Sequence, residues 1–191
     1  MRRQRRFVAS TFILIVLVTA TAVAETPAPP RLDVPYVPTH ERIVAAMLEM
    51  ASVTKDDVLY DLGSGDGRIV IAAARQFGAR GVGIDLDPQR IREANDNARE
   101  AGVTDRVQFV LGDIFDADLR PATVVTMYLL QEVNLRMRPK LTRELRPGAR
   151  IVSHNYDLGD WVPERKQTIE VSGTSHQVFR WTVPPRADGQ R

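Results

Sequence analysis

Three glycines at alternating positions carry the clearest chemical signal in this sequence. The stretch 61–67 reads DLGSGDG and begins inside the short apolar segment 57–62. Glycine accepts positive φ angles and lets a ligand approach the backbone closely. In an open α/β sheet, ligands lie beyond the carboxyl ends of the strands. We therefore predict a ligand site at this turn, with contacts from Asp61, Gly63, Ser64, Gly65 and Gly67.

The spacing and charge of this turn indicate which ligand it holds. The dinucleotide fingerprint is G-x-G-x-x-G, whereas this chain has G-x-G-x-G. Asp61 and Asp66 bracket the turn, and two carboxylates disfavour a pyrophosphate but favour a cation. S-adenosylmethionine is such a ligand, because it carries an ammonium and a sulfonium group. The sequence thus favours this cofactor over NAD; the simplest alternative is a glycine turn without a ligand.

Two further aspartates follow the next two predicted strands. Asp85 ends the segment GVGID at 81–85, where an acid can accept hydrogen bonds from ribose hydroxyls. Asp113 follows the apolar segment 107–111, where its carboxylate can accept from an adenine amino group while Ile114 or Phe115 flanks the ring. Each aspartate alone is weak evidence, but the ordered set with the glycine turn is specific. No spacing of His, Asp and Glu indicates a metal site.

Apolar segments alternate with segments of helical periodicity from residue 40 onwards. We expect strands at 57–62, 81–86, 107–111, 122–130 and 149–154, and helices at 40–52, 68–77, 88–101 and 131–145. Pro139 lies inside the last helix, which allows two short helices instead of one. Alternation in 168–171 and 177–183 predicts a final hairpin. The expected fold is α/β: a Rossmann-like, doubly wound, seven-stranded, mostly parallel sheet with a C-terminal antiparallel hairpin.

The first 24 residues have the pattern of a targeting segment. Residues 1–6 read MRRQRR, residues 7–23 are uncharged and mostly apolar, and residues 22–24 have the small-x-small pattern of a signal-peptidase site. We expect a signal peptide at 1–24, so that the chain is exported, with an uncleaved membrane anchor as the alternative. A linker at 25–35, a catalytic domain at 36–185 and a disordered tail at 186–191 complete the expected organisation.

The net charge argues against nucleic acid as a partner. The chain has 26 basic and 24 acidic residues, but four of the arginines lie in residues 1–6. The remaining chain therefore has 22 basic and 24 acidic residues, and this balance gives no electrostatic reason to bind a polyanion. The absence of cysteine excludes disulfides, thiolate metal ligands and a cysteine nucleophile.

The longer pattern resembles a known family. The matching blocks are YVPT at 36–39, DLGSGDGR at 61–68, GVGID at 81–85, VVTMYLL at 124–130 and PGARIVS at 147–153. They resemble class I S-adenosylmethionine-dependent methyltransferases, and most of all the bacterial relatives of the mitochondrial enzymes that methylate lysines of ATP-synthase c subunits and adenine-nucleotide carriers. Two positions depart from that pattern: His40 stands where the family usually has proline, and Asp85 where it often has glutamate.

This resemblance implies S-adenosyl-L-methionine as cofactor and a protein lysine as methyl acceptor. It places substrate-facing residues at the end of the fourth strand, so Tyr128 is the candidate catalytic residue, with a plain core role as an equal alternative. Thr39, with Tyr36, is a candidate lid over the cofactor, and His154 has a minor role.

Alternatives to a protein-lysine methyltransferase remain open at this point. They are a methyltransferase of small molecules, such as amines, and a module that binds the cofactor without turnover. We expect a monomer, possible membrane association through residues 7–23, and either an exported or a membrane-anchored chain. A domain that faces the cytoplasm stays open, because the cofactor is made there and the mitochondrial relatives also carry a hydrophobic N-terminal segment.

Overall fold

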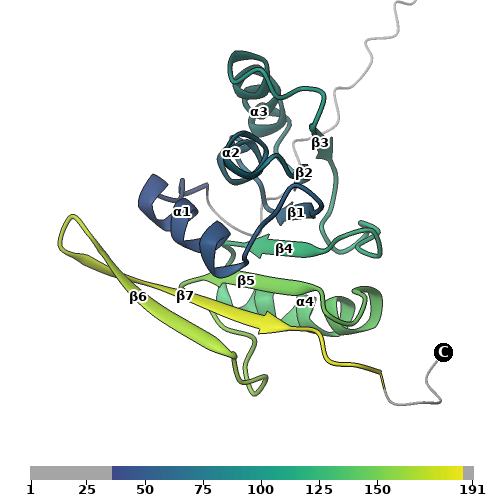
Figure 1. The fold of residues 1–191 in the computed structure, drawn as a ribbon, viewed down its shortest axis with the longest axis vertical. Helices are drawn as coiled ribbons and strands as arrows, with labels where there is room; N and C mark the ends of the chain where they lie inside the picture. Colours follow the sequence, from purple (N-terminus) through teal and green to yellow (C-terminus); the bar gives the residue numbers. More distant parts are fainter. Residues whose placement is uncertain (1–35, 187–191) are drawn as a thin grey trace, which may run out of the picture.

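The computed structural model describes residues 36–186, in which strands and helices alternate as the sequence predicts (Figure 1). Most element boundaries fall within two residues of the expected ones. The elements are α1 (Glu41–Met50), β1 (Val58–Leu62), α2 (Arg68–Phe77), β2 (Arg80–Asp85), α3 (Pro88–Glu100), β3 (Val107–Leu111), β4 (Val124–Met127), α4 (Gln131–Glu144), β5 (Arg150–His154), β6 (Arg165–Val171) and β7 (Thr174–Thr182).

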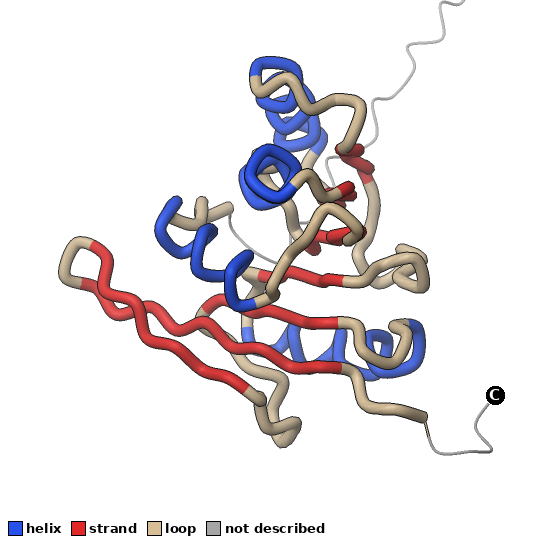
Figure 2. Tube along the Cα trace, in the orientation of Figure 1, coloured by secondary structure: helices blue, strands red, loops and turns tan. Residues whose placement is uncertain are grey.

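All seven strands form one sheet in the order β3-β2-β1-β4-β5-β7-β6 (Figure 2). Strands β1 to β5 pair in parallel, whereas β7 runs antiparallel to both β5 and β6. This arrangement confirms the predicted doubly wound sheet with its C-terminal hairpin. The strand order reverses between β1 and β4, and a crevice at the carboxyl ends of the strands is expected at that point.

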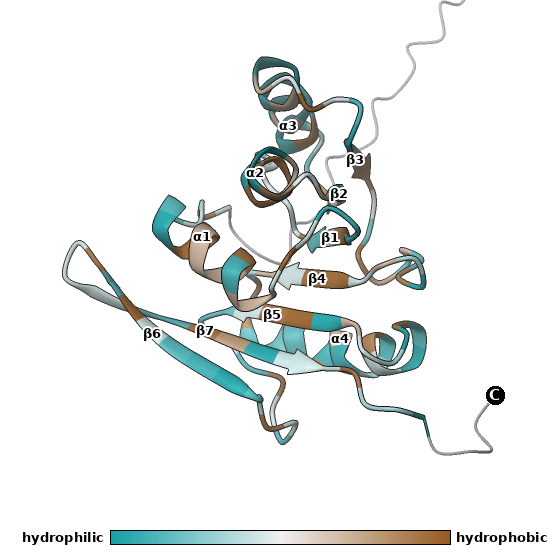
Figure 3. Ribbon diagram, in the orientation of Figure 1, coloured by the Kyte–Doolittle hydropathy of each residue, from teal (hydrophilic) through white to brown (hydrophobic). Residues whose placement is uncertain are grey.

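The helices divide between the two faces of the sheet. Helices α1, α2 and α3 lie on one face and α4 lies on the other (Figure 1). Each face has its own apolar core, the first built around Met47, Leu48 and Val70, the second around Met137 and Leu141. Figure 3 shows that the central strands β4 and β5 are largely apolar and that the edge strand β6 is mostly hydrophilic. The most apolar part of the sheet is thus its centre, next to the point where the strand order reverses.

The structure differs from the expected elements in two places. Helix α4 is a single helix with Pro139 inside it, rather than two short helices. Proline removes one hydrogen bond from the helical ladder, but Met137 and Leu141 on either side are fully buried and hold the helix in one piece. Strand β4 is also shorter than the apolar run 122–130, because residues 128–130 leave the sheet beside the site described below.

The predicted N-terminal segments lie largely outside the part of the chain that the structure describes. This applies to the signal peptide or anchor at 1–24, to the linker at 25–35 and to residues 187–191 of the predicted tail. Within residues 36–186, no helix is long and apolar enough to cross a membrane.

Candidate active site

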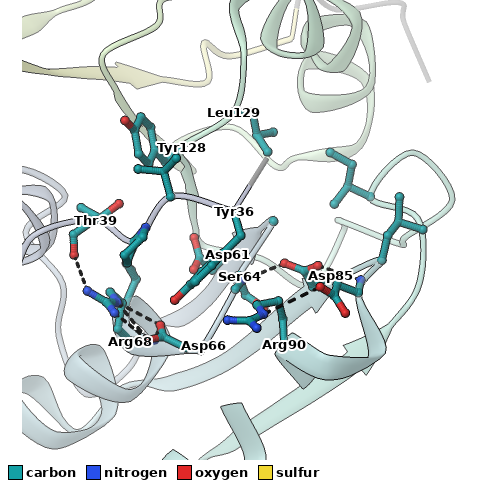
Figure 4. A pocket seen from close by; sticks show the side chains of 18 of the residues that line it. Tyr36, Thr39, Asp61, Ser64, Asp66, Arg68, Asp85, Arg90, Tyr128 and Leu129 are labelled. Carbon is teal, nitrogen blue, oxygen red and sulfur yellow. Dashed lines mark hydrogen bonds and ion pairs between the residues drawn. The ribbon is translucent and has the colours of Figure 1, made fainter. Parts of the chain in front are cut away.

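A pocket opens at the carboxyl ends of the central strands, where the strand order reverses (Figure 4). Its lining joins the glycine turn, the ends of β2 and β3, the segment before α1 and the segment after β4. Most of the predicted site residues line it: Thr39, Asp61, Gly63, Ser64, Gly65, Asp85, Asp113, Ile114 and Tyr128. Gly67 does not line the pocket and lies at the start of α2.

The glycine turn brings the backbone close to its neighbours. Gly65 has φ +53°, and a Cβ atom there would lie 2.5 Å from Cε2 of Tyr36. Gly67 has φ +80°, and a Cβ atom there would lie 2.5 Å from Cζ of Phe109. A side chain is therefore strained at both positions and has no space. The first glycine shapes the pocket floor, and the second lets α2 approach the sheet.

Asp61 is the most deeply buried acid of the pocket. It lies in β1, is 2% exposed, and accepts a hydrogen bond of 2.7 Å from Oγ1 of Thr126. Burial raises its pKa to about 7, and the charges of Asp85 and Asp66 add to the rise, although the bond from Thr126 opposes it. A cationic ligand beside this carboxylate would favour its ionised form.

Asp85 supports the glycine turn directly. Its Oδ2 accepts a hydrogen bond of 2.8 Å from the amide of Gly65, and its Oδ1 accepts one of 2.9 Å from the amide of Asp87. A carboxylate has about four acceptor positions, so about two remain for a ligand. The predicted ribose contact stays a prediction, and the structure adds a second role in shaping the loop.

Asp66 is not the free negative charge that its place in the glycine turn suggests. Arg68 folds back on it with Nη2 at 2.6 Å from Oδ2, and Nη1 of the same arginine donates to the carbonyl of Thr39 at 2.9 Å. Burial raises the pKa of Asp66, but the hydrogen bonds and charge of Arg68 outweigh it, so the pKa lies below its usual range. The pair is electrically neutral, and Asp61 and Asp85 supply the negative charge of the floor.

Asp113 begins the loop that covers the outer side of the pocket. Its Oδ1 accepts a hydrogen bond of 2.8 Å from the amide of Phe115, which fixes a tight turn after β3. Ile114 is 8% exposed and, like Phe115, lines the pocket. This turn brings a carboxylate and apolar side chains to the same place, as the prediction of an adenine site requires.

The residues present fit S-adenosylmethionine. Ser64 has a buried hydroxyl with no hydrogen-bond partner among the described residues. This hydroxyl faces β2 below the turn, because a Cβ atom at Gly83 would lie 2.7 Å from it, so the contact that Ser64 offers a ligand is its backbone. The close approach of backbone at Gly65 and the carboxylates of Asp61 and Asp85 supply further contacts for a polar, cationic group.

One pocket residue, Arg90, extends the predicted set, and it contacts Tyr36, which the sequence pairs with Thr39 as a candidate lid. The ring of Tyr36 lies against Gly65, and the guanidinium of Arg90 lies over that ring at 4.4 Å from its centroid. Arg90 also forms ion pairs with Asp87, at 3.7 Å, and with Glu93, at 2.6 Å. Nothing in the sequence around Arg90 marks it, because its contact with Tyr36 joins distant parts of the chain.

The opposite wall of the pocket is aromatic. Tyr128 lines the pocket, and its ring lies 3.9 Å from that of His154 and 6.5 Å from that of Tyr156, measured between ring centroids. Thr39 joins this wall from the N-terminal side and is 5% exposed; its role as a lid over the cofactor stays a prediction. His154 lies against Tyr128 and does not itself line the pocket. We call Thr39 and Tyr128 the acceptor wall; Tyr156 stacks beside Tyr128 and, like His154, does not line the pocket.

Residues 61–165 match a protein family described as the ANTKMT methyltransferase domain. Over 151 residues, the chain is 46% identical to a protein-lysine N-methyltransferase of Saccharolobus islandicus, a match that covers 78% of this chain and 94% of that relative. It is 34% identical to the adenine nucleotide translocase lysine N-methyltransferase of Mus musculus, over 83% of this chain and 72% of the relative.

A solved structure extends the likeness to three dimensions. The crystal structure described as an RNA methyltransferase from Salinibacter ruber, in complex with S-adenosyl-L-homocysteine, is 53% identical to this chain. The TM-score is 0.74, and the match covers 81% of this chain and 98% of that protein. S-adenosyl-L-homocysteine is what S-adenosylmethionine becomes when it has given up its methyl group.

Proposed function

Because the chain belongs to the ANTKMT methyltransferase family, we propose that this S-adenosylmethionine-dependent methyltransferase N-methylates a lysine side chain of a protein. The similarity to a protein-lysine N-methyltransferase extends over almost the whole of that relative. Asp61, Ser64, Gly65, Asp85 and Asp113 would hold the cofactor. The cofactor supplies an activated methyl group, and the chain itself positions the acceptor amine for an in-line approach.

The charge of the pocket argues against an acceptor that carries phosphates. Five aspartates line the pocket (Asp61, Asp66, Asp85, Asp87 and Asp113), and only two arginines do. Both arginines are already ion-paired with carboxylates. The net negative charge of the pocket lies on the cofactor side, where it attracts the cationic cofactor, and it repels phosphates.

The acceptor wall fits a lysine side chain. Tyr128 presents aromatic surface to the pocket, and Tyr156 lies beside it with 6.5 Å between the ring centroids. An aromatic wall packs against the aliphatic part of a lysine and attracts its cationic end by about 0.5–2 kcal/mol. We propose Tyr128 as the residue in contact with the acceptor.

An RNA acceptor is the competing function, because the Salinibacter ruber relative is described as an RNA methyltransferase. RNA binding requires basic groups that contact phosphates. The pocket has two such groups, and both are neutralised. This observation favours protein over RNA.

The decisive experiment supplies the full chain with radiolabelled S-adenosylmethionine and with fractionated protein, RNA and small molecules from cells. Label on a protein, retained as N-methyl-lysine after hydrolysis, is the expected result. Label in the RNA fraction, or in small molecules, would overturn the proposal. A chain that binds the cofactor and labels none of the three would be a binding module.

We also propose that residues 1–24 direct the chain to a membrane. The proposal is based on the four arginines before the apolar run 7–23, since positive flanks resist translocation. Fusions to Arg191 test it, with a phosphatase that is active only outside the cytoplasm and with a fluorescent protein that matures in the cytosol. Phosphatase activity is expected for an exported domain, and fluorescence alone would contradict export.

A further inference from the structure

Three polar side chains connect the acceptor wall to the surface of the protein. Oγ1 of Thr39 lies 3.5 Å from Nδ1 of His154, and Nε2 of His154 lies 2.9 Å from Nδ1 of His176. Thr39 lines the pocket, His154 is 1% exposed, and His176 is partly exposed on β7. The three groups form a continuous path from the pocket to the β6–β7 hairpin.

Burial keeps the central group of this path neutral. Burial, together with a smaller effect of the nearby His176, lowers the pKa of His154 to about 4. The groups that face His154 are Thr39 on the N-terminal segment, Tyr128 after β4 and His176 on β7. A neutral imidazole has one donor and one acceptor nitrogen, so it can pass a proton on without retaining charge.

The proposed reaction needs such a path, and the inference rests on that proposed function. A lysine amine carries a proton at neutral pH, and its lone pair can attack a methyl group only after the proton has left. Asp61, Asp66 and Asp85 lie on the cofactor side and are bonded to Thr126, Arg68 and backbone amides. The acceptor wall, made of Thr39 and Tyr128, has no carboxylate of its own.

We propose that Thr39, His154 and His176 form a proton relay that carries the proton of the acceptor amine out of the pocket. The amine gives its proton to Oγ1 of Thr39 while the hydroxyl proton moves to Nδ1 of His154. The proton on Nε2 of His154 moves to Nδ1 of His176, and the proton on Nε2 of His176 passes to water. One proton enters and one leaves, and the amine keeps its lone pair.

The relay requires one particular protonation state of the two histidines before each turnover. His154 must carry its proton on Nε2, accept from Thr39 at Nδ1 and donate to His176. After the product leaves, the transfers run in reverse while the pocket is open to water. Nε2 of His176 takes a proton from water, His176 passes its Nδ1 proton back to Nε2 of His154, and the Nδ1 proton of His154 returns through Thr39 to water in the pocket. This restores the resting state and leaves the proton of the amine in the solvent. Tyr128 covers the ring of His154 at 3.9 Å between centroids and shields it from the pocket, so the hydroxyl of Thr39 is the point of access.

The alternative role for the same contacts is mechanical. In that case the two histidines only anchor Thr39 and the segment before α1 to the sheet, and any side chain that keeps the hydrogen bond serves equally well. His176→Gln separates the two roles, because the glutamine oxygen accepts from His154 but does not pass a proton on. His40→Gln is the matched control, since His40 is exposed and caps α1.

The first test measures single-turnover methyl transfer by the full chain, with labelled S-adenosylmethionine and poly-L-lysine, across neutral and mildly alkaline pH. General acid–base groups contribute roughly 10²–10⁴-fold, so we expect His176→Gln to slow transfer at least about tenfold at neutral pH. The deficit should shrink as pH rises, because the amine then loses its proton to solvent. Cofactor affinity should be unchanged in both variants. Wild-type rates in His176→Gln at every pH would overturn the relay.

The second test needs no acceptor. Nitrogen-15 NMR of the labelled chain reports which nitrogen of each histidine carries the proton. The relay predicts His154 with its proton on Nε2, and a proton on Nδ1 of His154 would overturn it. If wild-type protein leaves poly-L-lysine unlabelled, the rate comparison is made with the cell protein fraction that the chain labels, and a proton on Nδ1 of His154 would still overturn the relay.

Discussion

The two sides of the pocket are built in different ways. The cofactor side is formed by short, local segments at the ends of β1, β2 and β3, and its contacts are mostly from side chains to nearby backbone, such as Asp85 to Gly65. The acceptor wall joins segments that are far apart in the chain. Thr39 and His154 are separated by 115 positions and meet only in the folded sheet.

This difference has a physical reason. The cofactor requires one particular arrangement of backbone and carboxylates, and a short stretch of sequence can supply most of it. A short motif therefore encodes the cofactor side. The acceptor wall depends on which side chains meet across the sheet, and no local spacing encodes them. We therefore expect substitutions on the cofactor side to act on cofactor affinity, and substitutions on the acceptor wall to act on transfer at unchanged affinity.

The largest effect is expected at Gly65. Gly65→Val places a branched side chain at φ +53° and in contact with Tyr36, whose ring is 2.5 Å from the new Cβ position. Strain of this kind costs about 1–3 kcal/mol, and the obstruction of the pocket floor adds to it. We expect the affinity for S-adenosylmethionine to fall by at least about 100-fold in calorimetry.

Gly102→Val provides the control for that measurement. Gly102 has φ +68°, but nothing lies within 4 Å of the position that its Cβ atom would take. This variant carries similar backbone strain away from the pocket, so its cofactor affinity should equal that of the wild type. A folded Gly65→Val protein with unchanged affinity would remove the glycine turn from the cofactor side.

Asp85 should give the next largest effect. Asp85→Ala removes the acceptor for the Gly65 amide and, on our proposal, for the ribose hydroxyls. A hydrogen bond to a charged group contributes about 1.5–3 kcal/mol, so affinity should fall roughly 10- to 150-fold. Asp105→Ala, at an exposed position, is the control. If Asp85→Ala binds the cofactor normally but transfers slowly, the two sides of the pocket are not separable in this way.

Tyr128 should show the opposite behaviour. Tyr128→Ala removes the aromatic surface of the acceptor wall and uncovers His154, whereas Tyr128→Phe keeps the ring at 3.9 Å from the histidine. With a contribution of about 0.5–2 kcal/mol, kcat/KM for the acceptor should fall roughly 2- to 30-fold in the alanine variant. The phenylalanine variant should retain most of the activity. Loss of cofactor affinity in either variant would place Tyr128 on the cofactor side.

Sequence alone is enough to predict the sheet, the class of enzyme and the cofactor. The alternation of apolar and amphipathic segments predicts the sheet, and the glycine turn with Asp85 and Asp113 indicates the cofactor, because all of these features are local in the chain. The comparisons and the fold confirm those conclusions. The roles of individual site residues stay predictions.

The contacts of the acceptor wall cannot be predicted from the sequence in the same way. From the sequence, a core role and a site role fit Tyr128 equally well, and His154 has a minor role. His176 is not singled out, because a histidine in an alternating hairpin has no distinguishing pattern. Their significance comes from the pairing of β5 with β7 and of β7 with β6, which brings the two imidazole rings together. Likewise, the ion pair that neutralises Asp66 depends on how Arg68 folds back at the start of α2.

The smallest expected effect is a pH dependence confined to the cofactor side. The pKa of Asp61 is raised to about 7, first by burial and then by the charges of Asp85 and Asp66. Below that pH this carboxyl is mostly neutral. A bound cation favours its ionised form, so binding lowers its pKa and releases a proton. The affinity for S-adenosylmethionine should therefore rise as the pH passes through about 7, by up to about tenfold, and level off above that range.

Calorimetry in two buffers of different ionisation enthalpy measures the released proton directly. Asp61→Asn keeps an acceptor for Oγ1 of Thr126 but carries no charge, so its affinity should be lower than that of the wild type at alkaline pH and should not vary with pH in this range. The acceptor wall has no part in this titration, because the pKa of His154 lies near 4. His154→Asn should therefore keep the wild-type pH dependence of cofactor binding, and a flattened profile in that variant would show that the two sides titrate together.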